Sequence, residues 1–394
     1  SARVRDGAAH RLPYAPHLRV DRFSASLAPD ALGSAAAWDA WVARLRALDT
    51  QARAYELANL MTARGGDAPE GELDVAATRA RDAACAERLT QELPQSAAQR
   101  QQLAQNAQVP DDYLTTRRVA GLYALTRVPF FWGVQRWQQS ASEAFAAQAA
   151  LAVVPDDWTR YTLAGERPSA DQIRAALTNA APDALGVPQL TPAAQQLLLR
   201  AYAPSLAVHT RGGFDRIGAL RWGQGATPVV DTAQPLAYQR VATTRYGTQT
   251  WVQLVYSFWF SERPAAGAFD LLSGALDAVV LRITLSPDGA PVLVDTIHAC
   301  GCYHLFIPTE ALQPVPGPQW QEWAFVPGTL PRLGLGQRVQ VRVASASHYV
   351  VDVRPDTETD LPAVPYMLQD EDALRALPLP GGGVQAFNGQ GLAA

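Results

Sequence analysis

The sequence DAVVLRITLSPDGAPVLVDTIH, residues 277–298, carries the pattern of a β-hairpin. Two segments in which apolar and polar side chains alternate, residues 277–285 and 292–298, flank a short stretch that contains Asp288-Gly289. Alternation with a period of two is typical of a half-buried strand, and Asp-Gly is a strong signal for a tight turn. The segment therefore predicts two antiparallel strands.

The position of the turn fixes the register of this hairpin, because a slip of one residue would move every side chain to the other face. With the turn centred on Asp288 and Gly289, Arg282 lies opposite Asp295, an opposite-charge pair of the kind that stabilises sheets. The same register predicts these further pairs: Leu285 with Val292, Ile283 with Val294, Val279 with His298, and Asp277 with Cys300.

The remaining pattern divides the chain into a helical first half and a strand-rich second half. Apolar residues recur at spacings of three and four early in the chain, which indicates helices; these are expected at 30–63, 74–107, 111–153, 169–181 and 191–203. Alternation predicts further strands at 236–243, 249–260, 337–344 and 348–354. We predict an α+β protein with a helical domain at 1–205, a mostly antiparallel β-domain (a sandwich or a partly closed sheet) at 206–355, and a Pro/Gly-rich C-terminal tail at 356–394.

The composition argues against a nucleic-acid partner and against a transmembrane segment. The chain has 394 residues, a hydrophobic fraction of 48% and a formal net charge of −4. A slightly acidic chain has no general attraction for nucleic acid, so no nucleic-acid partner is expected. No uninterrupted apolar run reaches about 18 residues, so no transmembrane segment is expected either.

The stretch His298-Ala299-Cys300-Gly301-Cys302-Tyr303-His304 concentrates reactive side chains. It holds two of the six histidines and two of the three cysteines of the chain. In a straight strand the four side chains would share one face, but six residues span roughly 20 Å. One ion cannot reach across that distance, because metal–ligand bonds are only about 2.0–2.3 Å long. Gly301 permits backbone angles that could fold the strand sharply between the cysteines.

Three arrangements of this stretch remain open. One is a mononuclear metal site formed by two or three of these residues and a distant ligand, for which we choose His348, with Asp277 as an additional candidate. The second is a pair of adjacent metal ions. The third is a disulfide between Cys300 and Cys302. Mixed His and Cys ligands suit zinc, copper or iron, and zinc ranks first because it imposes no special geometry.

No nucleotide-binding fingerprint is present, so no organic cofactor site is expected. The sequence assigns no catalytic residue and leaves open whether the protein is an enzyme. Candidate substrate-binding residues are Arg245, Arg263 and Tyr303, because arginine near aromatic strand residues can bind a carboxylate.

Several short segments resemble a family of uncharacterised exported or membrane-attached proteins of proteobacteria. The resemblance covers roughly residues 110–390 and implies a location in the periplasm or cell envelope of a Gram-negative bacterium. It brings no established activity, and it does not identify a metal. The segments that carry it are FDRIG (214–218), VDT (230–232), TRYG (244–247), FWF (258–260) with Arg263-Pro264, and DTIHACGCYH (295–304).

The sequence thus favours a periplasmic metalloprotein that binds a transition metal through residues of 298–304 and His348. In an enzyme, such a metal would activate water or dioxygen, or polarise a substrate oxygen. One alternative is a thiol/disulfide redox protein that uses Cys300 and Cys302. Another is a non-catalytic binding or assembly module, in which the helical half contacts an envelope protein partner.

Overall fold

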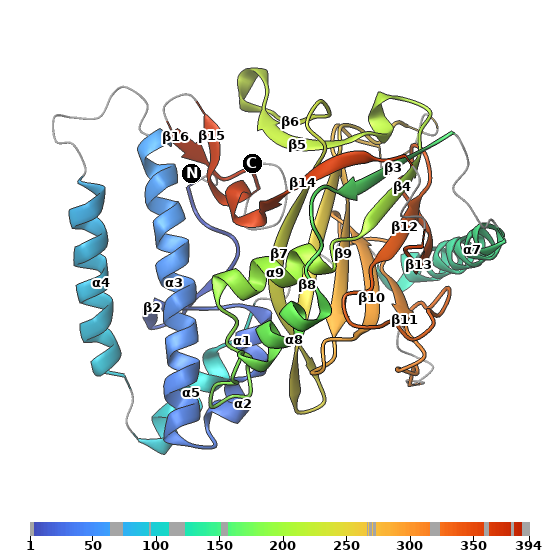
Figure 1. Ribbon diagram of the computed structural model, residues 1–394. Helices are drawn as coiled ribbons and strands as arrows, with labels where there is room; N and C mark the ends of the chain where they lie inside the picture. The colour runs from blue at the N-terminus through green and yellow to red at the C-terminus, as the bar shows by residue number, and fades with distance from the viewer. Residues whose placement is uncertain are drawn as a thin grey trace.

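The computed structural model describes residues 4–63, 74–93, 96–109, 123–150, 157–265, 267, 270, 273–315, 324–357, 362–379 and 382–387. Figure 1 shows the N-terminal helices on one side of the molecule and a large sheet on the other. The helices are α1 (Arg22–Ser26), α2 (Ala28–Ala31), α3 (Ala35–Ala63), α4 (Val75–Gln91), α5 (Ala97–Asn106), α7 (Tyr123–Ala149), α8 (Ala170–Thr178) and α9 (Pro192–Ala201), with the 3-10 helices η1 (Gly213–Asp215), η2 (Gln224–Ala226) and η3 (Glu371–Ala376).

The strands form one large mixed sheet and two small ones. In the large sheet the strands lie in the order β11-β10-β9-β8-β7-β14-β3-β4-β12-β13. In addition, β5 pairs with β8, and β6 pairs with β5. Neighbours are antiparallel except where β14 lies beside β7 and β3, and β12 beside β4. The strands are β1 (His10–Leu12), β2 (Ala15–Val20), β3 (Trp158–Leu163), β4 (Ser205–His209), β5 (Ile217–Trp222), β6 (Pro228–Asp231), β7 (Leu236–Tyr246), β8 (Gln249–Phe260), β9 (Asp277–Leu285), β10 (Pro291–His298), β11 (Leu305–Pro308), β12 (Val339–Val343), β13 (Val350–Pro355), β14 (Val364–Asp370), β15 (Leu377–Leu379) and β16 (Gly382–Val384).

The large sheet is nearly closed, and the α+β class is confirmed. Its two edge strands approach each other, since Leu305 of β11 and Val350 of β13 line the same cavity as Trp137 of α7. Helix α7 therefore covers the seam between the sheet edges. The enclosed core contains Leu254, Ile283 and many other buried apolar side chains.

The predicted hairpin forms β9 and β10, and most of its register is confirmed. Asp295 pairs with Arg282, and His298 pairs with Val279. A bulge between Pro291 and Leu293 shifts the last pair, so Leu285 lies opposite Pro291 rather than Val292. The turn is tied to α9, because the Tyr202 hydroxyl donates a hydrogen bond to the carbonyl of Gly289 at 2.7 Å.

Gly289 is a position where the hairpin requires glycine. Its φ is +88°, and an added Cβ would lie 2.5 Å from Cδ1 of Leu177 and 2.7 Å from Cδ1 of Leu335. We expect Gly289→Ala to lower the free energy of unfolding by about 1–3 kcal/mol, measured by urea denaturation. Gly247→Ala is the control, because that turn also has a positive φ but nothing within 4 Å. Equal losses in the two variants would contradict the steric part of this account.

One helical expectation needs correction. The single helix expected at 74–107 is two helices, α4 and α5, because Ser96 caps a new helix by accepting a hydrogen bond from the Gln99 amide. Helix α7, within the expected segment 111–153, continues through Pro129. Part of the expected segment 111–153 lies outside the described residues.

The described part of the expected C-terminal tail contains the strands β14, β15 and β16 and the 3-10 helix η3. Strand β14 lies between β7 and β3 and joins the two parts of the large sheet. Tyr366 is buried there, and its hydroxyl donates to the Pro204 carbonyl at 2.7 Å. The pattern did not indicate a central strand, because Pro365 cannot donate a ladder hydrogen bond.

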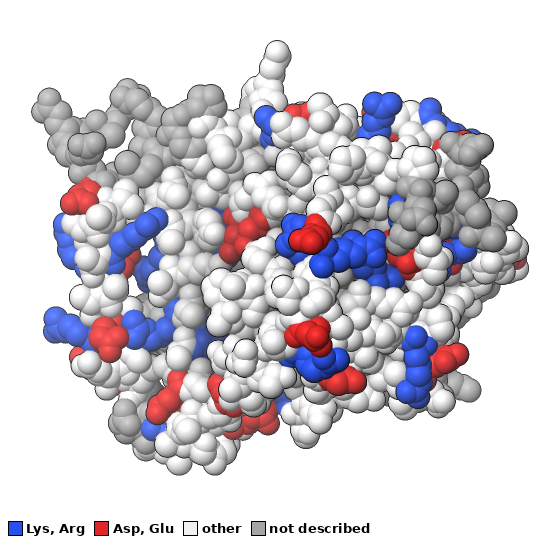
Figure 2. All heavy atoms as spheres, viewed as in Figure 1, with Lys and Arg blue, Asp and Glu red and all other residues white. Residues whose placement is uncertain are grey.

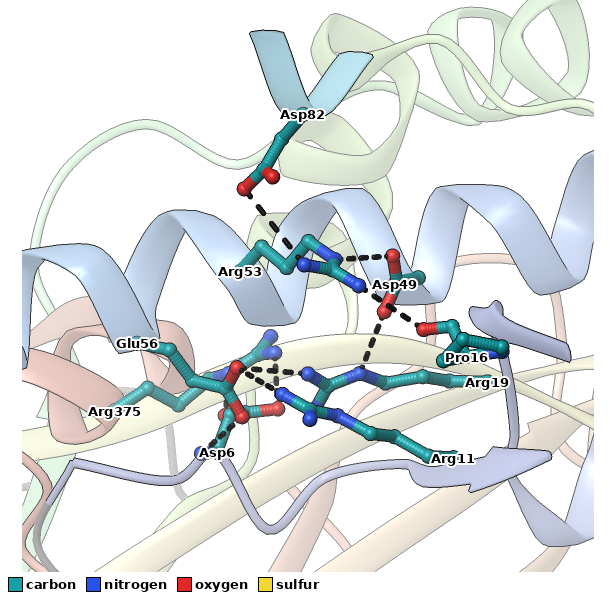
Figure 3. A network of polar contacts seen from close by, with 9 residues as sticks. All are labelled: Asp6, Arg11, Pro16, Arg19, Asp49, Arg53, Glu56, Asp82 and Arg375. Carbon is teal, nitrogen blue, oxygen red and sulfur yellow. Dashed lines mark hydrogen bonds and ion pairs between the residues drawn. The ribbon is translucent and has the colours of Figure 1, made fainter. Parts of the chain in front are cut away.

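A network of buried ion pairs holds the N-terminal elements together (Figure 3). Arg19 of β2 is buried and contacts Asp49 at 3.0 Å and Glu56 at 2.9 Å, both on α3. Arg375 of η3 bonds Asp6 at 2.7 and 2.8 Å. The Asp6 amide also donates to Oε1 of Glu56 at 3.3 Å, so the network connects the segment before β1 and the helix η3 with α3.

Candidate functional site

The His/Cys stretch is a chain reversal rather than a continuous strand. Strand β10 ends at His298 and β11 begins at Leu305. Gly301 has a φ of +80°, its amide donates to the His298 carbonyl at 2.8 Å, and the His298 amide donates to the Cys302 carbonyl at 3.0 Å. The bend that Gly301 permits is therefore formed. The four side chains do not share one face, as they would in a straight strand. His298 lies on the core side of the sheet, whereas His304 contacts Asp295 and Phe306 on the outer side.

The structure brings His298, Asp277 and His348 into direct contact. Nδ1 of His298 lies 3.2 Å from Oδ1 of Asp277, and Nδ1 of His348 lies 2.8 Å from Oδ2 of the same carboxylate. The exposed fraction is 3% for His298, 9% for Asp277 and 0% for His348. Two imidazoles therefore share one buried carboxylate.

The shared carboxylate is ionised. Burial alone would raise the pKa of Asp277, but the hydrogen bonds from His298 and His348 outweigh burial and hold this pKa well below its usual range. An ionised carboxylate only accepts hydrogen bonds. Both Nδ1 atoms must therefore carry a proton, which fixes the tautomer of each neutral ring.

His348 is fixed between two carboxylates. Its Nε2 lies 3.5 Å from Oδ1 of Asp215, an ion-pair distance that is too long for a normal hydrogen bond. Its ring stacks on Phe260 with a centroid distance of 3.9 Å. His348 itself has a φ of +50°, so the surrounding structure must maintain an unfavourable backbone conformation.

Asp215 supplies much of that support. It accepts hydrogen bonds from the amides of Arg211 at 2.8 Å and Ala346 at 2.8 Å, and from the Ser345 hydroxyl at 2.8 Å. The residue is fully buried. Asp215 therefore ties the loop that carries His348 to the loop before η1.

One ring nitrogen of His298, Nε2, is buried and has no hydrogen-bond partner among the residues that the structure describes. The ring lines a cavity of about 70 Å³. Trp137, Leu305 and Val350 are among the other residues around this cavity. The His298 ring therefore borders a small, mostly apolar space.

Two tyrosines and Arg263 border the same cavity region. The rings of Tyr303 and Tyr349 line the cavity, and their centroids are 4.5 Å apart. Nη2 of Arg263 donates to the Tyr349 hydroxyl at 3.1 Å, and Nη1 donates to the Ser347 carbonyl at 3.3 Å. Burial, followed by the hydrogen bond with Tyr349, raises the pKa of Tyr303. The Tyr303 phenol therefore stays neutral at neutral pH.

The two cysteines lie at the exposed outside of the turn. Cys300 and Cys302 are both free thiols, with no disulfide between them. Partial burial, followed by the hydrogen bond with and the charge of the adjacent Cys300, raises the pKa of the Cys302 thiol to about 11. Because the thiolate is the reactive form, this environment does not activate Cys302 for thiol exchange at neutral pH.

We expect Cys302 to be alkylated slowly at pH 8. A thiol with a pKa of about 11 is roughly 0.1% thiolate at that pH, against about a quarter for an ordinary cysteine. The measurement is peptide mass spectrometry after timed iodoacetamide labelling, with the exposed Cys85 as the internal reference for reagent access. Labelling of Cys302 as fast as that of Cys85 would disagree with the raised pKa.

The other candidates lie away from His298. His304 contacts Asp295 at 2.9 Å and Arg282 at 2.8 Å on the outer face. Arg245 forms an ion pair with Asp30 of the N-terminal region. The sequence candidates therefore divide into an inner group (Asp277, His298, Tyr303, His348 and Arg263), an outer group (His304 and Arg245) and the exposed thiols.

Sequence reasoning missed three residues that contact the inner group: Asp215, Tyr349 and Trp137. Trp137 reaches the cavity from α7, and its ring centroid is 5.0 Å from that of Tyr303. No local pattern connects residues so far apart in sequence. For Tyr349, the only sequence feature that pointed to the site was its position directly after His348.

Within the described residues, no set of three or more His, Cys, Asp or Glu side chains is arranged to hold a metal ion. In the same part of the chain, no helix is long and apolar enough to cross a bilayer. Figure 2 shows basic and acidic side chains close together on the visible face, in keeping with the Arg–carboxylate pairs at the surface.

Comparisons with known proteins give no relative. No family model matches the chain, and neither a curated protein nor a solved structure matches it. The interpretation of the site therefore rests on its geometry.

Proposed function

We propose that the protein is an enzyme that uses His298 as a general base in the cavity beside Trp137. The observation that carries this proposal is the unpartnered Nε2 of His298, on a ring whose Nδ1 faces the ionised Asp277. Hydrogen bonding at Nδ1 leaves the lone pair on Nε2, the atom that can take a proton. A carboxylate behind the ring also stabilises the imidazolium that forms.

The second histidine strengthens this arrangement. His348 has a carboxylate near each ring nitrogen, at 2.8 Å from Nδ1 and 3.5 Å from Nε2, and both carboxylates attract a positive charge on the ring. We infer that His348 carries the positive charge in the resting state while His298 is neutral. His348 then fixes the carboxylate of Asp277, and Asp277 orients His298.

The cavity indicates the class of substrate. A volume of about 70 Å³ is roughly that of two water molecules, so it holds only the reacting group of a substrate. The apolar wall suits a small acyl or carbonyl compound. In hydrolysis, His298 would take the proton of the attacking water and return it to the leaving group as the bond between the carbonyl carbon and that group breaks. Tyr349, whose oxygen already accepts from Arg263, would donate its own proton in a hydrogen bond to the oxyanion.

The experiment is a hydrolysis screen with short-chain esters, thioesters and amides, in chelated buffer. A substrate that the wild-type protein turns over, and that His298→Gln does not, supports the proposal. Equal turnover by the two proteins on every accepted substrate would overturn it. His304→Gln is the matched control, because that histidine also contacts an aspartate but lies on the other face of the sheet.

A second candidate function is metal binding. It is supported by two free thiols that lie close together in the turn that follows His298. Cys300 and Cys302 are close enough that the charge of one raises the pKa of the other. Thiolate and imidazole ligands suit zinc first, with copper or iron as alternatives. Binding at the turn would require ligands to move together, since the described side chains do not form such a group.

Elemental analysis after purification under reducing, chelator-free conditions tests this second function. Stoichiometric metal in the wild-type protein that is lost in Cys302→Ser, but not in Cys85→Ser, would support it. Metal-free wild-type protein would exclude it. The redox and assembly alternatives stay predictions, and so does the periplasmic location, which fractionation of the source cells would test.

A further inference from the structure

A second cavity, of about 240 Å³, lies on the outer face of the large sheet. Arg282 and Asp295 line it, and along their strands they alternate with the core residues Ile283 and Val294. The cavity is therefore on the opposite side of the sheet from His298. We refer to it as the outer groove, lined in part by Tyr246, Trp251, Gln253, Arg282, Asp295 and Phe306.

The strand register builds the outer groove. Gln253 of β8 pairs with Thr284 of β9, while Arg282 of β9 pairs with Asp295 of β10. Asp295 in turn pairs with Phe306 of β11. Cross-strand partners on one face are neighbours in space, so these side chains form adjacent rows on a rigid sheet.

Aromatic rings form two parts of the wall. Tyr246 and Trp251 stack with a centroid distance of 4.4 Å. Tyr246 is 54% exposed at the edge, whereas Trp251 is 8% exposed. Phe306 lies on the other side of the groove, where His304 packs against its ring at 4.0 Å.

The polar side chains of the outer groove form pairs, and the charges within these pairs offset each other. Nε of Arg282 donates to Oδ1 of Asp295 at 2.6 Å, and Arg245 is paired with Asp30. Nε2 of Gln253 donates to the Thr284 hydroxyl at 3.1 Å. The groove thus offers both donors and acceptors next to flat apolar surfaces, with no large excess of charge.

We propose that the outer groove binds a carbohydrate and holds a single neutral sugar ring. A sugar has an apolar C–H face that packs on an aromatic ring, and hydroxyl groups that both donate and accept hydrogen bonds. Arg282 can donate hydrogen bonds to such hydroxyls and Asp295 can accept hydrogen bonds from them. An anionic ligand would instead need an unpaired cation. The groove is smaller than the ~300–1,000 Å³ sites that bind drug-sized ligands, which fits one ring.

Saturation-transfer NMR of the full chain tests this proposal with glucose, galactose and N-acetylglucosamine, their short β-linked oligomers, and benzoate as an anionic aromatic probe. We expect at least one sugar to bind with millimolar affinity. Tyr246→Ala should weaken binding by about tenfold, and Gln253→Leu should weaken it as well. Tyr14→Ala is the control, because Tyr14 is 99% exposed elsewhere, and it should leave binding unchanged.

Two results would overturn the proposal: no transfer to any sugar in the panel, or transfer to benzoate alone. Sugar binding that survives both groove variants would also overturn it, because the ligand would then lie elsewhere. His298→Gln should not change sugar binding, so this test is independent of the proposed hydrolase.

Discussion

Asp277→Asn is expected to lower the free energy of unfolding by about 3–5 kcal/mol, the cost of removing one partner from a buried ion pair. The asparagine has the same shape, but its amide group donates and would face the Nδ1–H of one histidine. A buried imidazole of His298 or His348 would then lack an acceptor. Urea denaturation followed by circular dichroism at neutral pH measures the loss.

Asp231→Asn is the control for this prediction. Asp231 also forms an ion pair with an arginine, Arg221, but its side chain is 32% exposed. Exposed pairs contribute only about 0–1 kcal/mol. A loss in Asp277→Asn no larger than in the control would show that the shared carboxylate does not hold the site together.

The stabilising effect of Asp277 should depend on pH in a defined direction. Its pKa in the folded protein is depressed below the unfolded value of about 3.9. A depressed pKa contributes stability that is present above the unfolded pKa and lost as the pH falls toward the folded pKa. The difference between the wild-type protein and Asp277→Asn should therefore shrink below about pH 4. A difference that stays constant from pH 6 to pH 3 would contradict the assignment.

His298→Gln is expected to reduce turnover of any substrate found in the screen by about 10²–10⁴-fold, the usual contribution of a general base. Glutamine keeps a side-chain donor near Asp277 but cannot accept and return a proton at the position of Nε2. The loss should appear in kcat with a smaller change in KM, because the base acts on the transition state.

His304→Gln is the matched control, and it should change kcat less than about twofold, because the residue neither lines the His298 cavity nor contacts its ring. Circular dichroism and the urea midpoint of both variants must match the wild-type values. If the His304 variant lost as much activity as the His298 variant, this would contradict the proposal that the reaction takes place in the His298 cavity.

Much of the fold follows from local patterns in the sequence. Strand β9 begins and ends as the alternation predicts, and the Asp-Gly signal places the turn correctly. Helices α8 and α9 are marked by the caps Ser169 and Thr191. Strand β14 was not predictable, because its pairing with β7 and β3 depends on contacts far away in sequence.

The candidate site was predictable only in part. The hairpin register placed His298 at the end of a strand, and His348 was chosen as its distant partner; the two histidines do meet, through Asp277. The positions of Cys300, Cys302 and His304 depended on Gly301, which has a positive φ and reverses the chain. Strand alternation no longer applies across such a reversal, so His304 faces the other side.

Nitrogen NMR of the imidazole of His298 tests the central claim most directly. A long-range ¹H–¹⁵N correlation spectrum at neutral pH, with the signal assigned by its loss in His298→Gln, reports which ring nitrogen carries the proton. The account predicts a neutral ring with the proton on Nδ1 and none on Nε2. A proton on Nε2 at neutral pH, in either a neutral or a charged ring, would contradict the assignment of His298 as a base ready to accept a proton.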